Sequence, residues 1–452
     1  MTGAAAAAFD LAIVGGGLVG ASLAAALRHT PLRIALIEAH APDSAAQPSF
    51  DERTTALGNA SRRIFEGLGV WDALAPHAAA ITDIHVSDAG HFGFARLAAR
   101  DFGQAALGYV VPNRVLGRTL WTSLRSASHL HMYVPARLQS MQVDATQVRL
   151  VLQTADAPVQ LTSRLVVAAD GAHSLVRTAV GLAAQVDDYG QVAIVAGLRT
   201  DRANDGVAYE RFTAAGPMAL LPLSVPDPGH WRTLVWAARP DEAQRLMELG
   251  EAQFLAEWQQ AFGWRAGRAL QIGTRSRYPL ALSRSQGQVA PRTLLLGNAA
   301  QTLHPVAGQG FNLGLRDVAD LAGVLAPAAV ASADPGDPGL LAQYAALRRE
   351  DREGVIGFTD TLVRMFSSSH PLIAAARDAG LLLFDVLPPA KRALSRVSLG
   401  FGASTPRLAR GLAPCVPGCR TPTSPSSAAG WWARHWPCCW SGMRALPPGA
   451  SW

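Results

Sequence analysis

Cysteine is absent from the first 414 residues of this 452-residue chain, because Cys415, Cys419, Cys438 and Cys439 all lie near its end. No disulfide framework and no cysteine-based metal site can therefore form in the main body. We expect no metal centre in this protein.

Lysine is almost absent as well, since Lys391 is the only one and every other fixed cation is arginine. The formal net charge is +6 and the pI about 9.5. Part of that excess comes from Arg420, Arg434 and Arg444, because residues 415–452 carry no acid. The basic residues form no stripe and no nucleic-acid motif is present, so we expect no nucleic-acid partner.

Long uninterrupted apolar runs are also missing. The N-terminus MTGAAAAAFD lacks the basic region of a signal peptide. The stretch 11–27 contains Gly15, Gly16, Gly17 and Gly20 and is too short for a spanning helix. We therefore expect a cytoplasmic protein. Its mean hydropathy of +0.14 suits an apolar ligand or a membrane contact, although an Ala- and Leu-rich composition produces the same value.

Three apolar runs, at 9–14, 165–169 and 293–296, each end in small or polar residues. Such runs are typical of buried parallel strands. They predict one sheet assembled from distant parts of an α/β chain. Short β-type runs at 146–153, 191–199, 207–223 and 231–238 are separated by Gly, Pro and Asp and indicate an inserted antiparallel sheet. Residues from about 340 to 410 have a helical pattern.

The last stretch has a different composition. Residues 415–452 are rich in Pro, Ser, Trp and Cys and show neither a helical nor a strand period. We interpret residues 413–452 as an atypical tail that is disordered or derived from a frameshift. The alternative, a cysteine-bearing metal or membrane segment, matches no ligand spacing.

The first motif is Gly15-x-Gly17-x-x-Gly20, which follows the first apolar run and opens a helical segment. Gly15 permits a tight turn, Gly17 lets a pyrophosphate approach backbone N–H groups, and Gly20 allows close packing of helix on strand. Glu38 ends the next apolar run, where its carboxylate can accept hydrogen bonds from ribose hydroxyls. This pattern predicts a dinucleotide site but does not separate FAD from NAD.

Two further motifs resolve that choice. Residues 169–177 read ADGAHSLVR and residues 297–314 read GNAAQTLHPVAGQGFNLG. With the glycine motif they resemble the three fingerprints of the class A flavoprotein monooxygenases, over about residues 9–410. The resemblance implies a Rossmann-like FAD-binding domain built from 1–80, 105–180 and 290–335. It also implies a p-hydroxybenzoate hydroxylase-like, mainly antiparallel substrate-binding sheet from 81–104 and 181–289, and a helical region over 336–412.

The resemblance also implies roles for individual residues. Asp170 and Gly171 are expected near the pyrophosphate, and the loop from Pro305 to Asn312 around the flavin ring and ribityl chain. Gly308 and Gly310 in that loop would allow close backbone approach. Two further cofactor contacts are expected from Arg53, which matches the family's D-x-R arginine, and from Asn298, where the broad family has an acid. An amide still accepts and donates hydrogen bonds.

Within this family, the segments at 86–93, 209–223, 277–282 and 297–305 look like the ubiquinone-pathway hydroxylases, and most like the 2-polyprenyl-6-methoxyphenol hydroxylases. The implied reaction hydroxylates a polyprenylated phenol with O₂ through reduced FAD and a flavin C4a-hydroperoxide. Electrons would come from NAD(P)H or an electron-transfer protein. His304 is a candidate catalytic base, with a structural loop histidine as the alternative.

The implied substrate also suggests partners. Because a long isoprenoid chain stays in the bilayer, we expect peripheral association with a membrane surface, and contacts with other ubiquinone-biosynthesis enzymes. The helical region 355–400, with Arg377, Lys391 and Arg392, is the candidate contact, although its apolar residues would read the same way in a core.

Three other functions are alternatives for a chain of this fold. The first is a hydroxylase that acts on another ring position or on another aromatic compound. A flavin-dependent halogenase needs an active-site lysine, and Lys391 lies far from the motifs. A non-enzymatic prenyl-group carrier of the same fold would have lost flavin motifs that this chain keeps.

Overall fold

The three predicted buried strands lie side by side in one sheet. In the computed structural model, which describes residues 7–44, 47, 49–51, 53–90, 93–213, 215–224, 229–367 and 405–412, strand β1 pairs in parallel with β2 and β11, and β11 with β19. Within the described residues this first sheet has eight strands in the order β18-β19-β11-β1-β2-β8, extended by β10 and β9 beside β11. Their bounds are β1 Ala7–Val14, β2 Ile34–Ile37, β8 Leu130–Tyr133, β9 Ala136–Val143, β10 Val148–Thr154, β11 Val159–Ala168, β18 Val289–Ala290 and β19 Thr293–Leu295.

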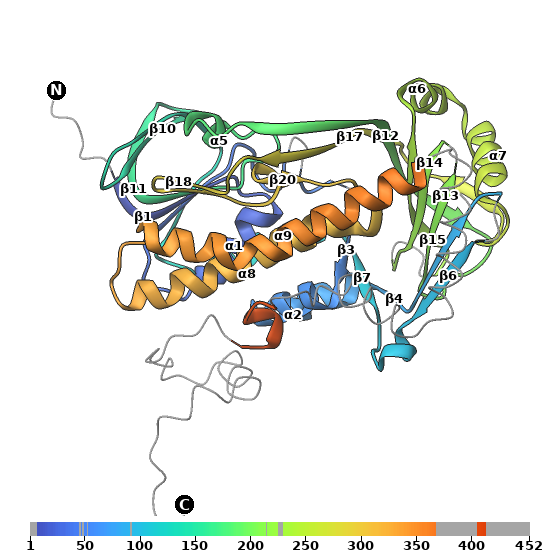
Figure 1. The fold of residues 1–452 in the computed structure, drawn as a ribbon, viewed down its shortest axis with the longest axis horizontal. Helices are drawn as coiled ribbons and strands as arrows, with labels where there is room; N and C mark the ends of the chain where they lie inside the picture. The colour runs from blue at the N-terminus through green and yellow to red at the C-terminus, as the bar shows by residue number, and fades with distance from the viewer. Residues whose placement is uncertain are drawn as a thin grey trace, which may run out of the picture.

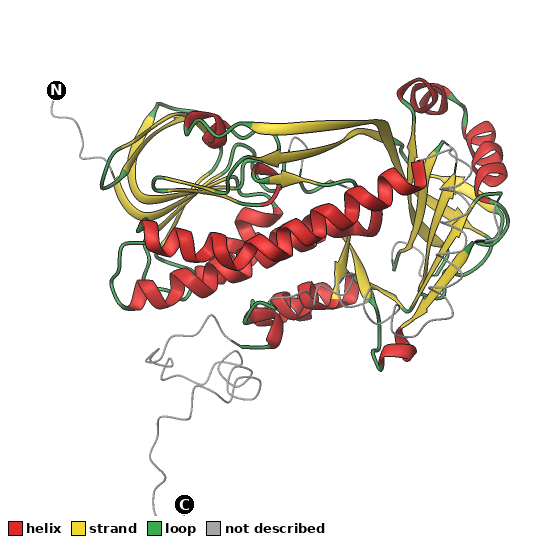
Figure 2. Cartoon of the chain, in the orientation of Figure 1, coloured by secondary structure: helices red, strands yellow, loops and turns green. Residues whose placement is uncertain are grey.

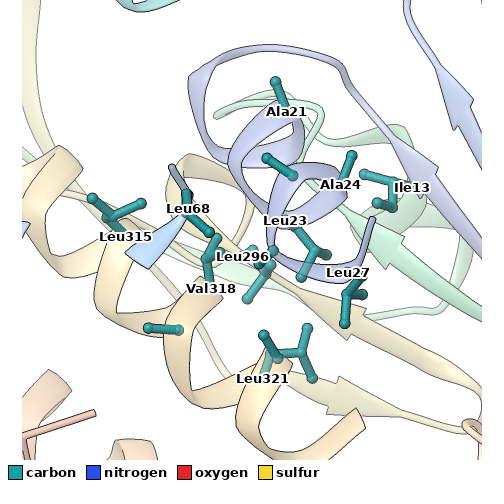
Figure 3. Packing of buried hydrophobic residues seen from close by; sticks show 14 of the residues in the cluster. Ile13, Ala21, Leu23, Ala24, Leu27, Leu68, Leu296, Leu315, Val318 and Leu321 are labelled. Atoms are coloured by element: carbon teal, nitrogen blue, oxygen red, sulfur yellow. The ribbon is translucent and has the colours of Figure 1, made fainter. Parts of the chain in front are cut away.

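Helices α1 (Leu18–Leu27) and α8 (Gln309–Val330) pack on one face of this sheet. Figure 3 shows Ile13 of β1, Leu23 and Leu27 of α1, and Val318 and Leu321 of α8 in one apolar cluster. The residues of β1 and α1 lie about 300 positions before those of α8 in the sequence, so the cluster joins distant segments of the chain. Each such side chain contributes about 1.5–3 kcal/mol when buried.

A second sheet lies at the other end of the molecule (Figure 1). Its order within the described residues is β20-β17-β12-β15-β14-β13-β5-β6, with β16 beside β12, and only β5 and β13 pair in parallel. The long strands β12 and β17 extend from this sheet toward the first one (Figures 1 and 2). The bounds are β5 Asp83–Asp88, β6 Phe94–Ala98, β12 Ala184–Thr200, β13 Val207–Thr213, β14 Gly216–Pro222, β15 Trp231–Ala238, β16 Ala269–Ile272, β17 Ser276–Ser285 and β20 Gln301–Thr302.

The remaining elements connect and cover the two sheets. A small sheet of order β3-β7-β4 lies between them, and α6 and α7 cover the outer face of the second sheet. The bounds are β3 Thr54–Gly58, β4 Ala79–Ile81, β7 Gly108–Pro112, α2 Asn59–Gly67, α3 Trp71–Leu74, α4 Asn113–Leu124, α5 Leu175–Ala179, α6 Pro240–Glu248, α7 Glu251–Phe262 and α9 Pro338–Ser367, with short 3-10 turns at η1 Ala75–His77, η2 Ala99–Phe102, η3 Gly297–Ala299, η4 Val306–Gly308 and η5 Leu408–Arg410.

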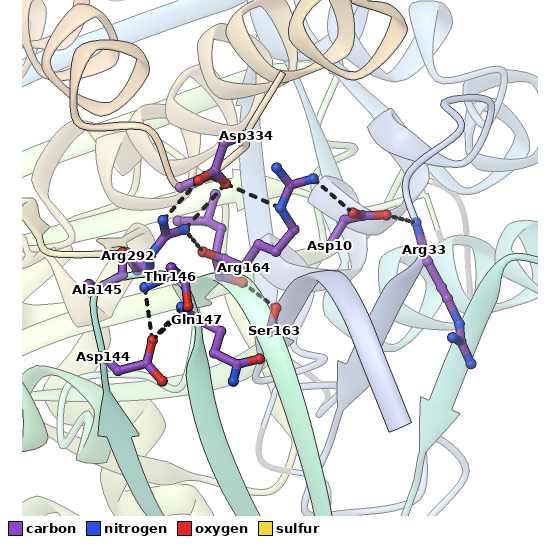
Figure 4. A network of polar contacts seen from close by, with 12 residues as sticks. Asp10, Arg33, Asp144, Ala145, Thr146, Gln147, Ser163, Arg164, Arg292 and Asp334 are labelled. Carbon is purple, nitrogen blue, oxygen red and sulfur yellow. Dashed lines mark hydrogen bonds and ion pairs between the residues drawn. The ribbon is translucent and has the colours of Figure 1, made fainter. Parts of the chain in front are cut away.

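Polar contacts close the edge of the first sheet where its parallel strands begin. Figure 4 shows Asp334, after α8, between the guanidinium groups of Arg164 and Arg292, with Arg164 also pairing with Asp10. The Arg292 Nη2 to Asp334 Oδ2 distance is 2.8 Å. This network fixes the strand beginnings, and the opposite edge carries the loops with the predicted motifs.

The predicted fold class is confirmed: the first sheet is assembled from discontinuous segments, and a mainly antiparallel sheet is inserted between them. One sequence interpretation is wrong. Residues 148–154 form β10, which pairs with β9 and β11 in the first sheet and not in the inserted one, because it is the middle strand of an antiparallel meander. The domain boundaries stay predictions. The tail at 413–452 and most of the region 355–400 lie outside the described residues.

Candidate cofactor and active site

The glycine motif forms the turn between β1 and α1. Gly15 has a φ of +101°, and a β-carbon added there would lie 2.3 Å from the carbonyl oxygen of Ala169. A β-carbon on Gly20 would lie 1.9 Å from the carbonyl oxygen of Gly15, so helix and turn are in direct contact. At Gly17 the added atom would meet only the Ser49 side chain, at 3.0 Å. Gly15 and Gly20 are therefore required by the fold, whereas Gly17 leaves room for a ligand.

Glu38 closes this turn from the end of β2. Its Oε2 accepts a 2.6 Å hydrogen bond from the Gly16 N–H, and its Oε1 accepts one of 2.9 Å from the His40 N–H. A carboxylate has about four acceptor sites, so both oxygens keep capacity for a ribose hydroxyl. Glu38 therefore holds the turn, and its contact with a ribose stays a prediction.

Sequence reasoning missed Trp121 of α4. Its Nε1–H donates a 2.9 Å hydrogen bond to the Gly16 carbonyl oxygen, and both groups are buried. The contact spans 105 residues, and no local pattern marks it. Trp121 thereby fixes the orientation of the peptide between Gly16 and Gly17.

The second motif lies directly beside the first. The backbone of Asp170 adjoins Gly15, and Gly171 has a φ of +87°. Burial raises the pKa of Asp170. Its Oδ2 accepts a hydrogen bond from the Val176 N–H, whereas its buried Oδ1 has no partner among the described residues.

Arg177, which ends the second motif, ties it to the third. One of its nitrogens donates to the Ala299 carbonyl oxygen at 2.9 Å, and the other to the Ala172 carbonyl oxygen at 2.8 Å. Asn298, next to Ala299, is exposed. The chain therefore brings Asn298 to the same edge of the sheet as Asp170.

The third motif passes from β20 through a loop to α8, and Asn312 anchors it. Its amide nitrogen donates to the carbonyl oxygens of Ala56 and Gly308, and its oxygen accepts from the Gly58 N–H and the Ser61 hydroxyl. All four distances lie between 2.6 and 2.9 Å. Asn312 thus fixes the loop against β3 and α2, which is a structural role that its predicted cofactor contact did not include.

The same loop contains three other predicted residues. Gly308, with a φ of +59°, caps the amino end of α8. Pro305 is exposed, and a β-carbon at Gly310 would meet no atom within 4 Å. The amino terminus of this 22-residue helix therefore has open space around it and can stabilise negative charge there.

His304 is buried, and burial lowers its pKa to about 4. Its Nδ1 accepts a hydrogen bond from the Val306 N–H, so Nε2 carries the proton and donates to Gln191 Oε1 at 3.2 Å. The ring also lies edge-on to Tyr189, with the centroids 5.3 Å apart. Both nitrogens have protein partners, which favours the structural alternative over the catalytic one.

Arg53 lies just before β3 in a cluster with Asp51 and Tyr278. Its Nε pairs with Asp51 Oδ2 at 2.5 Å, and its guanidinium carbon lies 4.5 Å from the Tyr278 ring centre. The Tyr278 hydroxyl donates to the same carboxylate oxygen at 3.3 Å. Tyr278 belongs to β17, so this cluster joins the glycine-motif side of the molecule to the second sheet.

These features fit a bound dinucleotide flavin. Gly17 presents backbone N–H groups with space beside them, the orphaned Asp170 Oδ1 adjoins that turn, and Gly171 and Gly310 have open surroundings. Most of the predicted residues fall on the turn after β1, the loop after β11 and the segment that leads into the first turn of α8. Glu38 follows β2, Arg53 directly precedes β3, and Asn298 lies in η3 after β19.

Comparisons with known proteins agree with this geometry. A family model described as an FAD binding domain matches residues 8–359. The ubiquinone hydroxylase UbiL of Rhodospirillum rubrum is 38% identical over 91% of this chain and 95% of its own length. The 3-demethoxyubiquinol 3-hydroxylase of Escherichia coli is 30% identical over 86% and 98%. This chain belongs to the ubiquinone-biosynthesis hydroxylase family of FAD-dependent monooxygenases.

A solved structure supports the fold of this family member. The p-nitrophenol 4-monooxygenase PnpA of Pseudomonas putida DLL-E4 superposes with a TM-score of 0.72 over 87% of this chain and 99% of its own, at 18% identity. The family assignment makes the protein an FAD-dependent monooxygenase. The roles of the individual residues stay predictions.

Proposed function

We propose that this monooxygenase hydroxylates the aromatic ring of a polyprenylated phenol in ubiquinone biosynthesis, with O₂ and electrons from NAD(P)H or an electron-transfer protein. The observation that carries the proposal is the near full-length similarity to UbiL together with all three flavin motifs. When bound, FAD supplies the redox chemistry and the activated oxygen.

The three motifs supply most of the residues that would hold FAD. Gly17 and the amino end of α1 would bind the pyrophosphate, Glu38 a ribose, and Asp170 and Asn298 the part of the cofactor at the sheet edge. Arg53 would contact the flavin or its phosphates. The loop from Pro305 to Asn312 would surround the ring, and the start of α8 would stabilise negative charge on it.

The inner face of the second sheet would orient the phenol and exclude water. Thr233 of β15 reaches Thr54 of β3, with 2.9 Å between their hydroxyl oxygens, so this face of β15 points toward the cofactor side. Val235 lies on the same face, and Val195 and Ala219 are its cross-strand partners. An apolar wall of this kind holds an aromatic ring and keeps water from the reacting atoms.

Product analysis tests the proposal. Cells that lack this enzyme would be supplied with the gene and a prenylated phenol precursor, and the ring products separated by mass spectrometry under ¹⁸O₂. We expect one labelled oxygen atom on the ring. A ring that carries no labelled oxygen, although the protein has FAD bound, would reject the proposal.

Other members of the family leave one alternative open. The E. coli relative is named for hydroxylation at position 3 of demethoxyubiquinol. A different ring position, or another aromatic substrate, is thus the main alternative, and the same product analysis distinguishes them. The prenyl-carrier alternative would give a colourless protein without FAD.

We also propose that the enzyme binds a membrane surface, because each CH₂ of an isoprenoid chain moved into water costs about 0.8 kcal/mol. Among the described residues, no helix is both long and apolar enough to cross a membrane. The candidate contact with Arg377, Lys391 and Arg392 lies outside the described residues. Replacing these three by Glu should weaken flotation with anionic liposomes while FAD content stays normal, and unchanged flotation would reject that contact.

A further inference from the structure

A cavity of about 440 Å³ opens on the outer face of the second sheet, away from the cofactor motifs. It is lined by Ser87, Tyr209, Arg211, Phe262, Gly263, Trp264 and Arg265. These residues belong to β5, β13, the end of α7 and the segment directly after it, at the opposite end of the molecule from β1 and α1 (Figure 1).

The strand register explains why this cavity is separate from the proposed phenol site. Side chains alternate along β13, so Tyr209 and Arg211 point to one face and Phe212 to the other. Tyr209 packs against Phe262 of α7, whereas Phe212 stacks on Phe366 of α9, with the centroids 3.5 Å apart. The cavity is therefore on the α7 side of the sheet.

Two guanidinium groups meet in this cavity. Arg211 donates to the Ala261 carbonyl oxygen at 3.2 Å and the Ser87 hydroxyl at 3.4 Å, and Arg265 donates to His85 Nε2 at 2.6 Å. Within the described residues, no ion pair joins either guanidinium to a carboxylate. Burial lowers the pKa of Arg211, and the positive charge of Arg265 lowers it further, whereas Asp88 opposes both effects.

His85 does not supply the missing negative charge. Burial, together with Arg265 and Arg96, lowers its pKa to about 4, so the imidazole is neutral at physiological pH. It accepts the hydrogen bond from Arg265 and thereby orients that guanidinium. The cavity is thus lined by two cations, one of which the neutral His85 orients, and paired guanidinium groups are the chemistry that binds a phosphate group.

Aromatic side chains at the rim identify the source of that phosphate. Trp264 is 67% exposed and sits beside Arg265, and Phe94 of β6, stacked on His85, is 36% exposed. Tryptophan and arginine are the side chains that typically lie at the headgroup level of a bilayer. A site for a soluble phosphate compound has no need of exposed apolar side chains at its rim.

We propose that this cavity binds the phosphate of an anionic phospholipid and docks the outer face of the second sheet on the membrane. The choice of a lipid over a soluble phosphate rests on the proposed function, since a polyprenylated substrate resides in the bilayer. Arg211 and Arg265 contact the phosphate oxygens, and Trp264 inserts at the headgroup level.

Vesicle binding of the full-length FAD-containing protein tests the site. Vesicles of phosphatidylcholine alone are compared with vesicles containing phosphatidylglycerol, and the variants are Arg265→Glu and Trp264→Ala. Arg265→Glu should weaken binding to the anionic vesicles by about five-fold or more, because each cation near such a surface contributes about 1 kcal/mol. Trp264→Ala should also weaken this binding, because it removes the aromatic side chain at the headgroup level. Arg268→Glu is the matched control, because Arg268 is exposed on the same segment but does not line the cavity.

Two results would overturn the proposal. Equal loss in Arg268→Glu and Arg265→Glu would show general attraction without a site. Binding of glycerol 3-phosphate that depends on Arg265, without any vesicle binding, would assign the cavity to a soluble phosphate. Hydroxylation of a detergent-dispersed phenol is measured in parallel. A wild-type protein that does not hydroxylate the phenol rejects the proposed function, whereas a wild-type protein that hydroxylates it but does not bind anionic vesicles rejects only the docking site.

Discussion

The guanidinium of Arg348 and the carboxylate of Asp317 form an ion pair of 2.7 Å in which neither side chain is exposed. Arg348 belongs to α9 and Asp317 to α8. The same guanidinium also contacts Asp320 at 3.0 Å and Asp351 at 2.6 Å. This buried cluster fixes α9 along α8, the helix whose first turn carries Asn312.

Removal of one partner from this cluster should be strongly destabilising. In Asp317→Ala, the positive charge of Arg348 loses one of its three carboxylate partners, and we expect a loss of about 3–5 kcal/mol in the free energy of unfolding. Urea denaturation measures it. The control is Asp241→Ala, whose pair with Arg239 is exposed, with an expected change of about 0–1 kcal/mol. Similar losses in both variants would contradict the role of the cluster.

Two glycines of the first motif should respond differently to added side chains. Gly17→Val should leave the fold intact, because the nearest side chain is Ser49, but should block the pyrophosphate and abolish FAD binding. Gly20→Val should prevent folding, because its β-carbon would overlap the Gly15 carbonyl oxygen. Circular dichroism and FAD released by acid are the measurements. Normal FAD content in Gly17→Val would show that the cofactor assignment is wrong.

The hydrogen bond from Trp121 to Gly16 should contribute to FAD affinity. Trp121→Phe keeps the apolar packing but leaves the Gly16 carbonyl without its donor, so we expect the Kd of the apoprotein for FAD to rise about five- to ten-fold. Trp258→Phe is a suitable control, because the buried Nε1 of Trp258 has no hydrogen-bond partner among the described residues. Fluorescence titration with FAD compares the two, and an equal effect of both changes would count against this contact.

His304 should make stability depend on pH in a defined direction. Its pKa is about 4 in the folded protein, against the ordinary value of 6.5 that we take for the unfolded chain. Between these two pH values the unfolded chain therefore binds more protons than the folded protein. Its contribution to stability is therefore lost as the pH falls from 6.5 towards 4. Asp320, whose pKa is raised by burial to about 6, acts in the opposite direction.

Comparison of the wild type with His304→Gln isolates this contribution, since Asp320 is present in both. We expect the stability difference between them to change by about 2–3 kcal/mol in favour of the variant between pH 7.5 and pH 4. Urea denaturation across this range is the measurement. A constant difference would show that His304 has an ordinary pKa.

The tail can be separated from the residues just before it. Leu408 and Ala409 are buried in the main core cluster, next to α2. Truncation after Ala413 should therefore leave FAD content and activity intact, whereas truncation after Thr405 should lower the melting temperature by removing this contact. Loss of FAD after truncation at Ala413 would show that the residues beyond Ala413 are structural.

Local patterns predicted the elements that lie within one sequence segment. The apolar runs at 9–14, 165–169 and 293–296 correspond to β1, β11 and β19, and Gly15 and Gly20 have the geometry that their motif requires. Strands and turns are determined largely by residues that are neighbours in the sequence, so local patterns predict them. The strand at 148–154 was assigned to the wrong sheet because a short β-type run does not identify its partner.

Contacts between distant residues were the part that sequence patterns did not reveal. Trp121 with Gly16 and Tyr278 with Asp51 join residues separated by 105 and 227 positions. The second role of Asn312, across 254 positions to Gly58, is of the same kind. Such pairs depend on how the sheets are placed in space, and a single sequence carries no local signal for them.

The pairing of β19 with β11 has a consequence for how the protein is made. Translation proceeds from the N-terminus, so β1, β2 and β11 leave the ribosome long before Thr293–Leu295 does. Until then, the β11 edge that accepts β19 has unpaired N–H and C=O groups, and α8 is not available to cover the apolar face. The nascent chain therefore exposes this strand edge and this apolar face throughout synthesis of the insert. We expect it to bind chaperones that act on the ribosome.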